Sequence, residues 1–155
     1  MLFRSTKRDP GLGYTIAGLP IIQNVMLWVS PRSLFENGLR QAFFNDALVT
    51  QDMVERYWEL NRKVGNRAAT LKRFRTPRDS FLVDNANRIT APTLILWGDQ
   101  DMLTPRDMGD AWNAAIRGSK LIVFRNVGHV PMEEVPEQSA RAVREFLSPS
   151  PAPAG

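Results

Sequence analysis

The sequence has no cysteine, and it has only one histidine in 155 residues. Without cysteine the chain can form no disulfide, no thiolate nucleophile and no cysteine-based metal site. It also lacks a phosphate-binding loop, a dinucleotide motif and any cluster of metal-ligand residues, so we predict no cofactor and no metal. His129 is therefore the only imidazole that could serve as a general base.

Long apolar runs are missing as well. The most apolar stretch, residues 14–29, contains four interruptions, at Gly18, Pro20, Gln23 and Asn24. Because a membrane span needs about 20 mostly apolar residues, we predict a buried or pocket-lining helix there and no membrane span. The first residues show no apolar core of the kind found in signal peptides, which favours a cytoplasmic location.

The formal net charge is +4, and charged residues make up 23% of the chain. The basic residues are scattered, with one local run at residues 72–75, and aromatic residues do not alternate with them. We interpret the positive charge as a solvated surface. A nucleic-acid-binding protein is accordingly the least favoured function, and we predict no nucleic-acid partner.

The pattern of the chain changes near residue 84. Residues 1–84 show helical spacing broken by glycine and proline, and Thr50 is expected to cap one of the helices. Residues 85–147 show a strand–helix–strand–helix order. The tail, residues 148–155, is rich in proline, alanine and serine, and we predict that it is disordered.

In the second region the strands are expected at residues 93–97 and 120–124. Thr104 is expected to cap the helix between them, with Pro105 at its first position. Apolar strands that alternate with helices predict a parallel sheet covered on both faces. Two strands alone leave both sheet edges unpaired, so we expect an incomplete domain that is weakly folded or self-associating by itself.

Each predicted strand ends in a loop with ionisable residues. Asp99 and Asp101 follow the first strand, and His129 follows the second. The carboxyl ends of adjacent parallel strands lie at one edge of a sheet, so the two loops should meet there. A carboxylate can then orient the imidazole as a base for a hydroxyl nucleophile. Asp101 also suits a turn, through bonds from nearby backbone N–H groups.

Residues 92–105 and 128–136 resemble the carboxyl-terminal part of α/β-hydrolase fold proteins. Members typically show Pro-Thr-Leu-Ile-Leu-Trp-Gly-x-x-Asp-x-x-x-Pro and, later, Gly-His-x-Pro-x-x-Glu-x-Pro, and both patterns are met without a gap. The resemblance implies Asp101 as triad acid and His129 as triad base, in the nucleophile–acid–base order of this fold. Asp99, the rival acid, falls at a variable position of the pattern.

The resemblance also implies the fold class and its organisation. Residues of about 10–81 resemble the helical cap that such enzymes insert before the acid strand. We therefore predict a partial α/β-hydrolase fold, with a cap-like region (1–84) followed by a short parallel strand–helix–strand–helix unit of the core (85–147).

The family's nucleophile is absent from the sequence. The fold places it in a Gly-x-Ser-x-Gly turn before the cap, and no serine here has glycine at both required positions. No aspartate occupies such a turn either, and the glycine-rich segment of an oxyanion hole is missing. We therefore expect a fragment that is inactive as an isolated chain, and whether the parent's nucleophile is serine or aspartate stays open.

The resemblance predicts hydrolysis by a serine-type triad, at an ester or a carbon–carbon bond, of a small apolar substrate in the parent enzyme. Two alternatives remain. The chain could be a non-catalytic binding module, or it could be one half of a split hydrolase that pairs with a nucleophile-bearing half.

Residues next to the two motif positions are candidates for the substrate pocket. Leu103 and Val130 flank the acid and the base and are expected to line it. Glu134 is expected to order the turn and helix start that follow it. The aromatic residues of the first region could line a pocket, but packing is the preferred role for most of them: Trp28, Phe43, Phe44, Tyr57 and Trp58.

Overall fold

The computed structural model describes residues 30–75 and 81–148. The chain divides into two compact units: one includes Val49–Asp84 and the residues before Gln41, and the other combines Gln41–Leu48 with the residues from Asn85 onward. The helix expected within residues 14–29, Trp28 and most of the tail lie outside the described residues.

In its described part the first unit is helical. It contains α3 (Arg32–Ala42, whose last two residues belong to the other unit), α4 (Gln51–Arg62), α5 (Asn66–Arg75) and the short α6 (Phe81–Asp84). Thr50 caps α4 as predicted, because its side chain accepts a hydrogen bond of 3.2 Å from the Met53 N–H. A cap of this kind stabilises a helix by about 1 kcal/mol.

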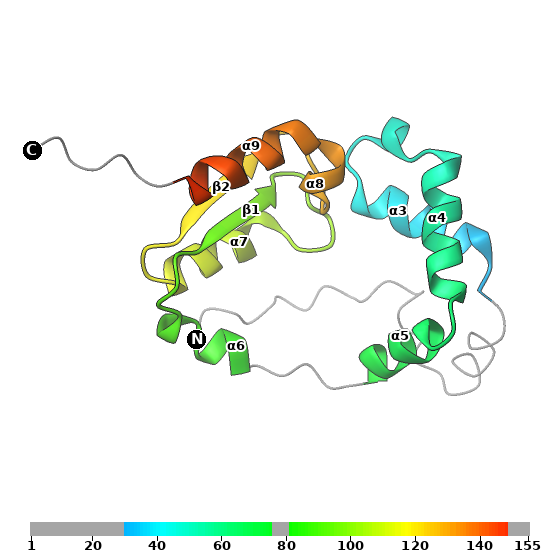
Figure 1. Cartoon of the computed structure of the whole chain (residues 1–155), viewed down its shortest axis with the longest axis horizontal. Coiled ribbons are helices and arrows are strands. Elements are labelled where there is room, and N and C mark those ends of the chain that lie inside the picture. Colours follow the sequence, from blue (N-terminus) through cyan, green and yellow to red (C-terminus); the bar gives the residue numbers. More distant parts are fainter. Residues whose placement is uncertain (1–29, 76–80, 149–155) are drawn as a thin grey trace, which may run out of the picture. The chain divides into compact units, whose positions relative to one another are not determined.

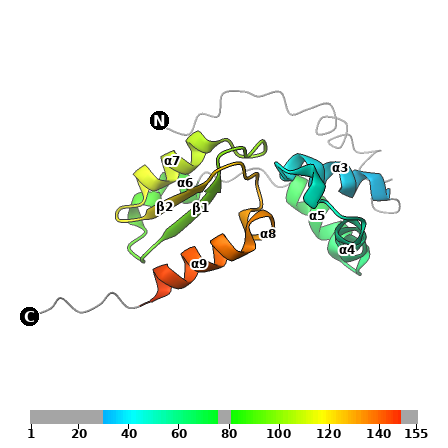
Figure 2. The ribbon, with the colours of Figure 1, turned by 90° about the horizontal axis from the view of Figure 1, so that it is seen from above.

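The second unit contains the predicted strand–helix–strand–helix order (Figure 1). Its elements are η1 (Asp46–Leu48), η2 (Ala86–Arg88), β1 (Leu94–Gly98), α7 (Arg106–Ala115), β2 (Lys120–Phe124), α8 (Pro131–Glu134) and α9 (Pro136–Leu147). The two strands are parallel neighbours, as predicted, with Leu94 opposite Lys120 and Gly98 opposite Phe124. Helices α7 and α9 lie on opposite faces of the strand pair (Figure 2).

The core of this unit lies on the face that α9 covers. Phe124, Val127 and Ala142 are buried there, and three partly buried residues pack against them: Leu96, Ile122 and Val135. In the described residues β1 and β2 form the whole sheet. Alternate side chains of each strand therefore reach opposite helices, as in a parallel sheet covered on both faces.

One local prediction is wrong. Thr104 does not cap α7; that helix begins at Arg106, with Pro105 at the cap position and no side-chain cap bond. The Thr104 hydroxyl is instead bonded to the Asp101 carboxylate, at 2.6 Å. A capping hydroxyl would accept a hydrogen bond from an N–H in the first turn, whereas this hydroxyl lies in the loop before the helix and donates a charge-assisted hydrogen bond to the carboxylate.

No helix in the described ranges combines the length and the apolar character that a membrane crossing requires.

Candidate active site

The loops that leave β1 and β2 lie side by side. Just after β1 ends, the Asp99 N–H donates a hydrogen bond of 3.0 Å to the Phe124 carbonyl. The Gln100 N–H donates one of 3.0 Å to the Val127 carbonyl. Gly98 makes this approach possible, because a Cβ there would meet the carbonyl oxygens of Val127 and Gly128. The first acidic loop and the histidine loop are thus joined at the carboxyl edge of the strands.

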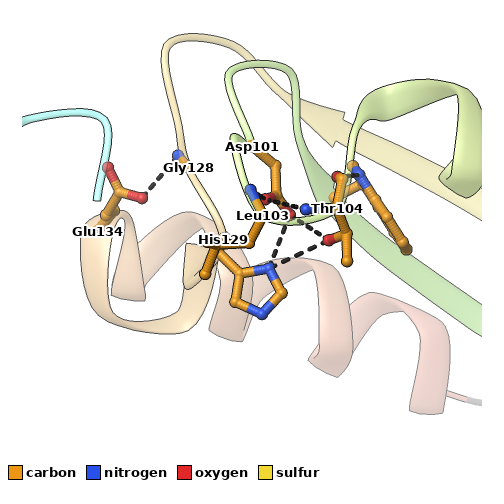
Figure 3. Close-up of polar contacts among 7 residues, drawn as sticks. Asp101, Leu103, Thr104, Gly128, His129 and Glu134 are labelled. Carbon is orange, nitrogen blue, oxygen red and sulfur yellow. Dashed lines mark hydrogen bonds and ion pairs between the residues drawn. The ribbon is translucent and has the colours of Figure 1, made fainter. Parts of the chain in front are cut away.

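Both carboxylate oxygens of Asp101 are fully engaged in this loop (Figure 3). Oδ1 accepts the backbone N–H groups of Leu103 and Thr104, each at 2.8 Å. Oδ2 accepts the Thr104 hydroxyl at 2.6 Å and faces His129 Nδ1 at 2.8 Å. The predicted proximity of Asp101 and His129 is therefore confirmed, and the turn bonding expected of Asp101 occurs as well.

The environment of Asp101 keeps it ionised. Its side chain is only 4% exposed, and this burial alone would raise the pKa of the carboxyl. Hydrogen bonds from the Thr104 hydroxyl and N–H, and the interaction with His129, outweigh the burial and hold the pKa of Asp101 below its ordinary value of 3.8. At neutral pH the group is therefore an acceptor with no proton to give.

That charge state determines which nitrogen of His129 carries the proton. Nδ1 faces a carboxylate oxygen that can only accept, so Nδ1 is the donor. In the neutral ring Nε2 then carries the lone pair, and in the described part of the chain it has no hydrogen-bond partner. The side chain is 40% exposed. The ring therefore presents a basic nitrogen to whatever binds beside it.

Hydrogen bonds also connect the histidine loop to a segment far away in the sequence. The His129 N–H donates to the Ala42 carbonyl at 2.7 Å. Buried Glu134 accepts the Gly128 N–H at 2.6 Å with Oε1, and it accepts the Phe44 N–H at 2.9 Å with Oε2. The expectation that Glu134 orders the following helix start is wrong, because no side chain caps α9 and this carboxylate bonds backbone groups that precede it. The sequence pointed to the side chains of Phe43 and Phe44 in this segment, but the role of its backbone groups carries no motif.

Asp99 has a different partner. Its Oδ1 accepts the Asn126 N–H at 2.7 Å, which links the two loops through a backbone bond. Asn126 has a φ of 56°, in the left-handed region, where asparagine is among the more tolerant residues. Asp99 therefore joins the loops, and the imidazole is bonded to Asp101.

The remaining candidates occupy varied positions. Leu103 is 48% exposed beside Asp101, and Val130 is half-buried after His129. Phe43 is buried, Phe44 is half-exposed, and the half-buried Trp58 donates its indole N–H to the Ser30 carbonyl at 2.8 Å. Within residues 30–75 and 81–148, no three or more histidine or acidic side chains lie together as a metal site would require.

Because the pKa of Asp101 is lowered in the folded protein, the free energy of unfolding should depend on pH in the acid range. We expect its contribution to folding to be fully present above its unfolded value of 3.8 and to be lost as pH falls through the lower folded value. Urea unfolding at a series of pH values between 7 and 2 should show this loss. Asp101→Asn should reduce the fall in the free energy of unfolding at low pH, the acid limb of the stability curve. Asp110→Asn, at a carboxylate that is 53% exposed, should leave that fall unchanged. Equal acid limbs in both variants would contradict the assignment.

Comparison with known proteins agrees with this geometry. The family described as "Alpha/beta hydrolase family" matches residues 7–142. A 2-hydroxy-6-oxononadienedioate/2-hydroxy-6-oxononatrienedioate hydrolase from Paraburkholderia xenovorans is 30% identical over 149 residues, which is 95% of this chain and 45% of that protein. Monoacylglycerol lipase abhd6-A from Xenopus laevis is 37% identical over 67 residues, which is 43% of this chain and 20% of that protein.

Solved structures show the same fold. A hydrolase from Pseudomonas aeruginosa has a TM-score of 0.67 at 25% identity, over 92% of this chain and 52% of that one. A mutant meta-cleavage product hydrolase from Pseudomonas fluorescens has a TM-score of 0.67 at 22% identity, over 79% and 47%. The chain spans less than half of each sequence relative named above. The predicted partial fold is confirmed, and the chain belongs to the alpha/beta hydrolase family.

Proposed function

We propose that Asp101 and His129 are the acid and base of a hydrolase triad whose nucleophile lies outside these 155 residues. The observation that carries the proposal is the 2.8 Å contact between Asp101 Oδ2 and His129 Nδ1 at the carboxyl edge of the strands. A buried, ionised carboxylate orients the ring and stabilises its charged form, and Nε2 is left to take a proton from a hydroxyl. This is the division of roles that acyl transfer requires.

The substrate is an ester or a related acyl compound, with cleavage of a carbon–carbon bond as a variant of the same chemistry. Two similarities support this range: one relative is named a monoacylglycerol lipase, and another is named a hydrolase of 2-hydroxy-6-oxononadienedioate. We propose that Leu103 and Val130 contact an apolar part of the substrate, since they flank the two motif residues and Leu103 is half-exposed. Their truncation should weaken the preference for longer acyl chains.

The nucleophile and the oxyanion donors come from other residues, because no Gly-x-Ser-x-Gly turn occurs in the sequence. We propose that residues 85–147 are part of the hydrolase core and that residues 1–84 act as its cap. In the residues that the structure describes, no further strand pairs with β1 or β2, and we propose that strands add at these edges, either from a nucleophile-bearing segment or from a second copy of the chain. Sedimentation of the chain alone and with such a segment distinguishes these partners.

The test is esterase activity with short-chain nitrophenyl esters. The 155-residue chain should show no turnover above its His129→Ala variant, because no group is present to form and stabilise an acyl intermediate. Joining a family segment that carries Gly-x-Ser-x-Gly should produce activity that His129→Ala abolishes. Turnover by the chain alone that His129→Ala removes would place the nucleophile within these residues. Continued inactivity of the joined protein, if it is folded, would favour a binding module.

A further inference from the structure

Thr104 uses every polar group it has within this site. Its N–H donates to Asp101 Oδ1 at 2.8 Å, and its hydroxyl donates to Asp101 Oδ2 at 2.6 Å. Its carbonyl accepts the indole N–H of Trp97 at 3.0 Å. A residue held at three points by hydrogen bonds has little freedom left, so its side chain is fixed relative to the strand that carries Trp97.

Trp97 is itself well seated. It belongs to β1, and its ring lies against Gly109 of α7, where an added Cβ would come within 2.8 Å of the ring. The position of Thr104 is therefore set by the sheet and its covering helix, and not only by the loop. A site built on regular elements holds its geometry more closely than one built on a loop alone.

The direction of the hydrogen bonds follows from the number of protons. The Thr104 hydroxyl has one proton, and it is donated to Asp101 Oδ2. Thr104 Oγ1 also lies 3.1 Å from His129 Nδ1. Nδ1 carries the ring proton because it faces the carboxylate as well. Thr104 Oγ1 therefore meets Nδ1 as an acceptor, and the Nδ1 proton is shared between Asp101 and Thr104 (Figure 3).

We propose that Thr104 is a positioning residue that fixes the orientation of the His129 ring through a shared Nδ1–H bond to its hydroxyl and to the Asp101 carboxylate. A single acceptor leaves the ring free to pivot about one bond, whereas two acceptors from one rigid loop define its plane. Nε2 is then held in one direction before any substrate binds, which is the preorganisation that general-base catalysis uses. The catalytic consequence rests on the proposed roles of Asp101 and His129, whereas the ring geometry does not.

The test uses Thr104→Val, which keeps the shape of the side chain and removes its hydroxyl. Thr104→Ser, which keeps the hydroxyl, is the matched variant. His129 is the only histidine, so its Nδ1–H gives a single imidazole signal in ¹⁵N-labelled protein. Loss of a hydrogen bond of ordinary strength should make exchange of this proton with water about tenfold faster in Thr104→Val. Thr104→Ser should match the wild type, and so should Thr90→Val, at an exposed threonine.

In the nucleophile-joined enzyme, Thr104→Val should lower kcat about tenfold with little change in KM, because the ground-state contacts of the substrate are untouched. An unchanged exchange rate of the Nδ1 proton in Thr104→Val would overturn the inference. Fast exchange in Thr104→Ser, in a protein whose β1 amides stay protected, would overturn it as well. The proton signal does not depend on turnover. Faster exchange in Thr104→Val, combined with an inactive nucleophile-joined enzyme, would contradict the proposed function and support the positioning role.

Discussion

In the nucleophile-joined enzyme, Asp101→Asn should reduce kcat by about 10⁴-fold, the size of the effect that the equivalent change has in serine proteases. The structure supplies a specific reason. Oδ1 accepts two backbone N–H groups, so the amide oxygen of the variant would take that place. Its NH₂ group would then face His129 Nδ1, where the wild type has an acceptor.

A donor opposite Nδ1 forces the ring proton onto Nε2. His129 could then no longer accept a proton from the nucleophile, although the loop and the binding surface would be almost unchanged. The matched control is Asp99→Asn, since its amide oxygen can still accept the Asn126 N–H and it is not bonded to the ring. Steady-state kinetics of both variants decide the matter. A nearly active Asp101→Asn beside an inactive Asp99→Asn would transfer the acid role to Asp99.

The second large effect concerns stability. Glu134→Ala should lower the free energy of unfolding by about 3 kcal/mol, because it removes the acceptor for one buried backbone N–H group, at about 1–3 kcal/mol, and for two part-buried ones that cost less. The groups affected are the N–H of Gly128 at 2.6 Å, of Phe44 at 2.9 Å and of Asn45 at 3.4 Å. No space is available for a rearranged chain at Gly128, where a Cβ would already meet the Ala42 carbonyl.

Urea titration followed by tryptophan fluorescence measures this change. Glu137→Ala, at an exposed carboxylate in the first turn of α9, is the control and should cost less than about 1 kcal/mol. Glu134→Gln should fall between the two, because its amide oxygen can serve one side while its NH₂ group opposes the donors on the other. A Glu134→Ala variant as stable as the Glu137→Ala control would show that the carboxylate does not join the 41–45 segment to the histidine loop.

The sequence by itself determined the features whose signals are local. Continuous apolar runs at residues 94–97 and 121–124 predicted two parallel strands, because such runs are buried on both faces, and the strands observed are Leu94–Gly98 and Lys120–Phe124. Two contiguous patterns identified Asp101 and His129, and the order of the elements implied that their loops would meet, as they do at 2.8 Å. The lone histidine made that pairing the only available choice for an imidazole.

Only the tertiary structure decided how the pair is held. Thr104 reads as a helix cap in the sequence, and its hydroxyl turned to Asp101 because a carboxylate lay within reach in the folded loop. Glu134 reads as part of a helix start, and its carboxylate bonds Phe44, 90 positions away. Backbone N–H groups are present at nearly every residue, so an acceptor for one of them leaves no trace in the sequence of the distant segment. Partnerships of that kind are set by which segments the packing brings together, and local patterns carry no information about them.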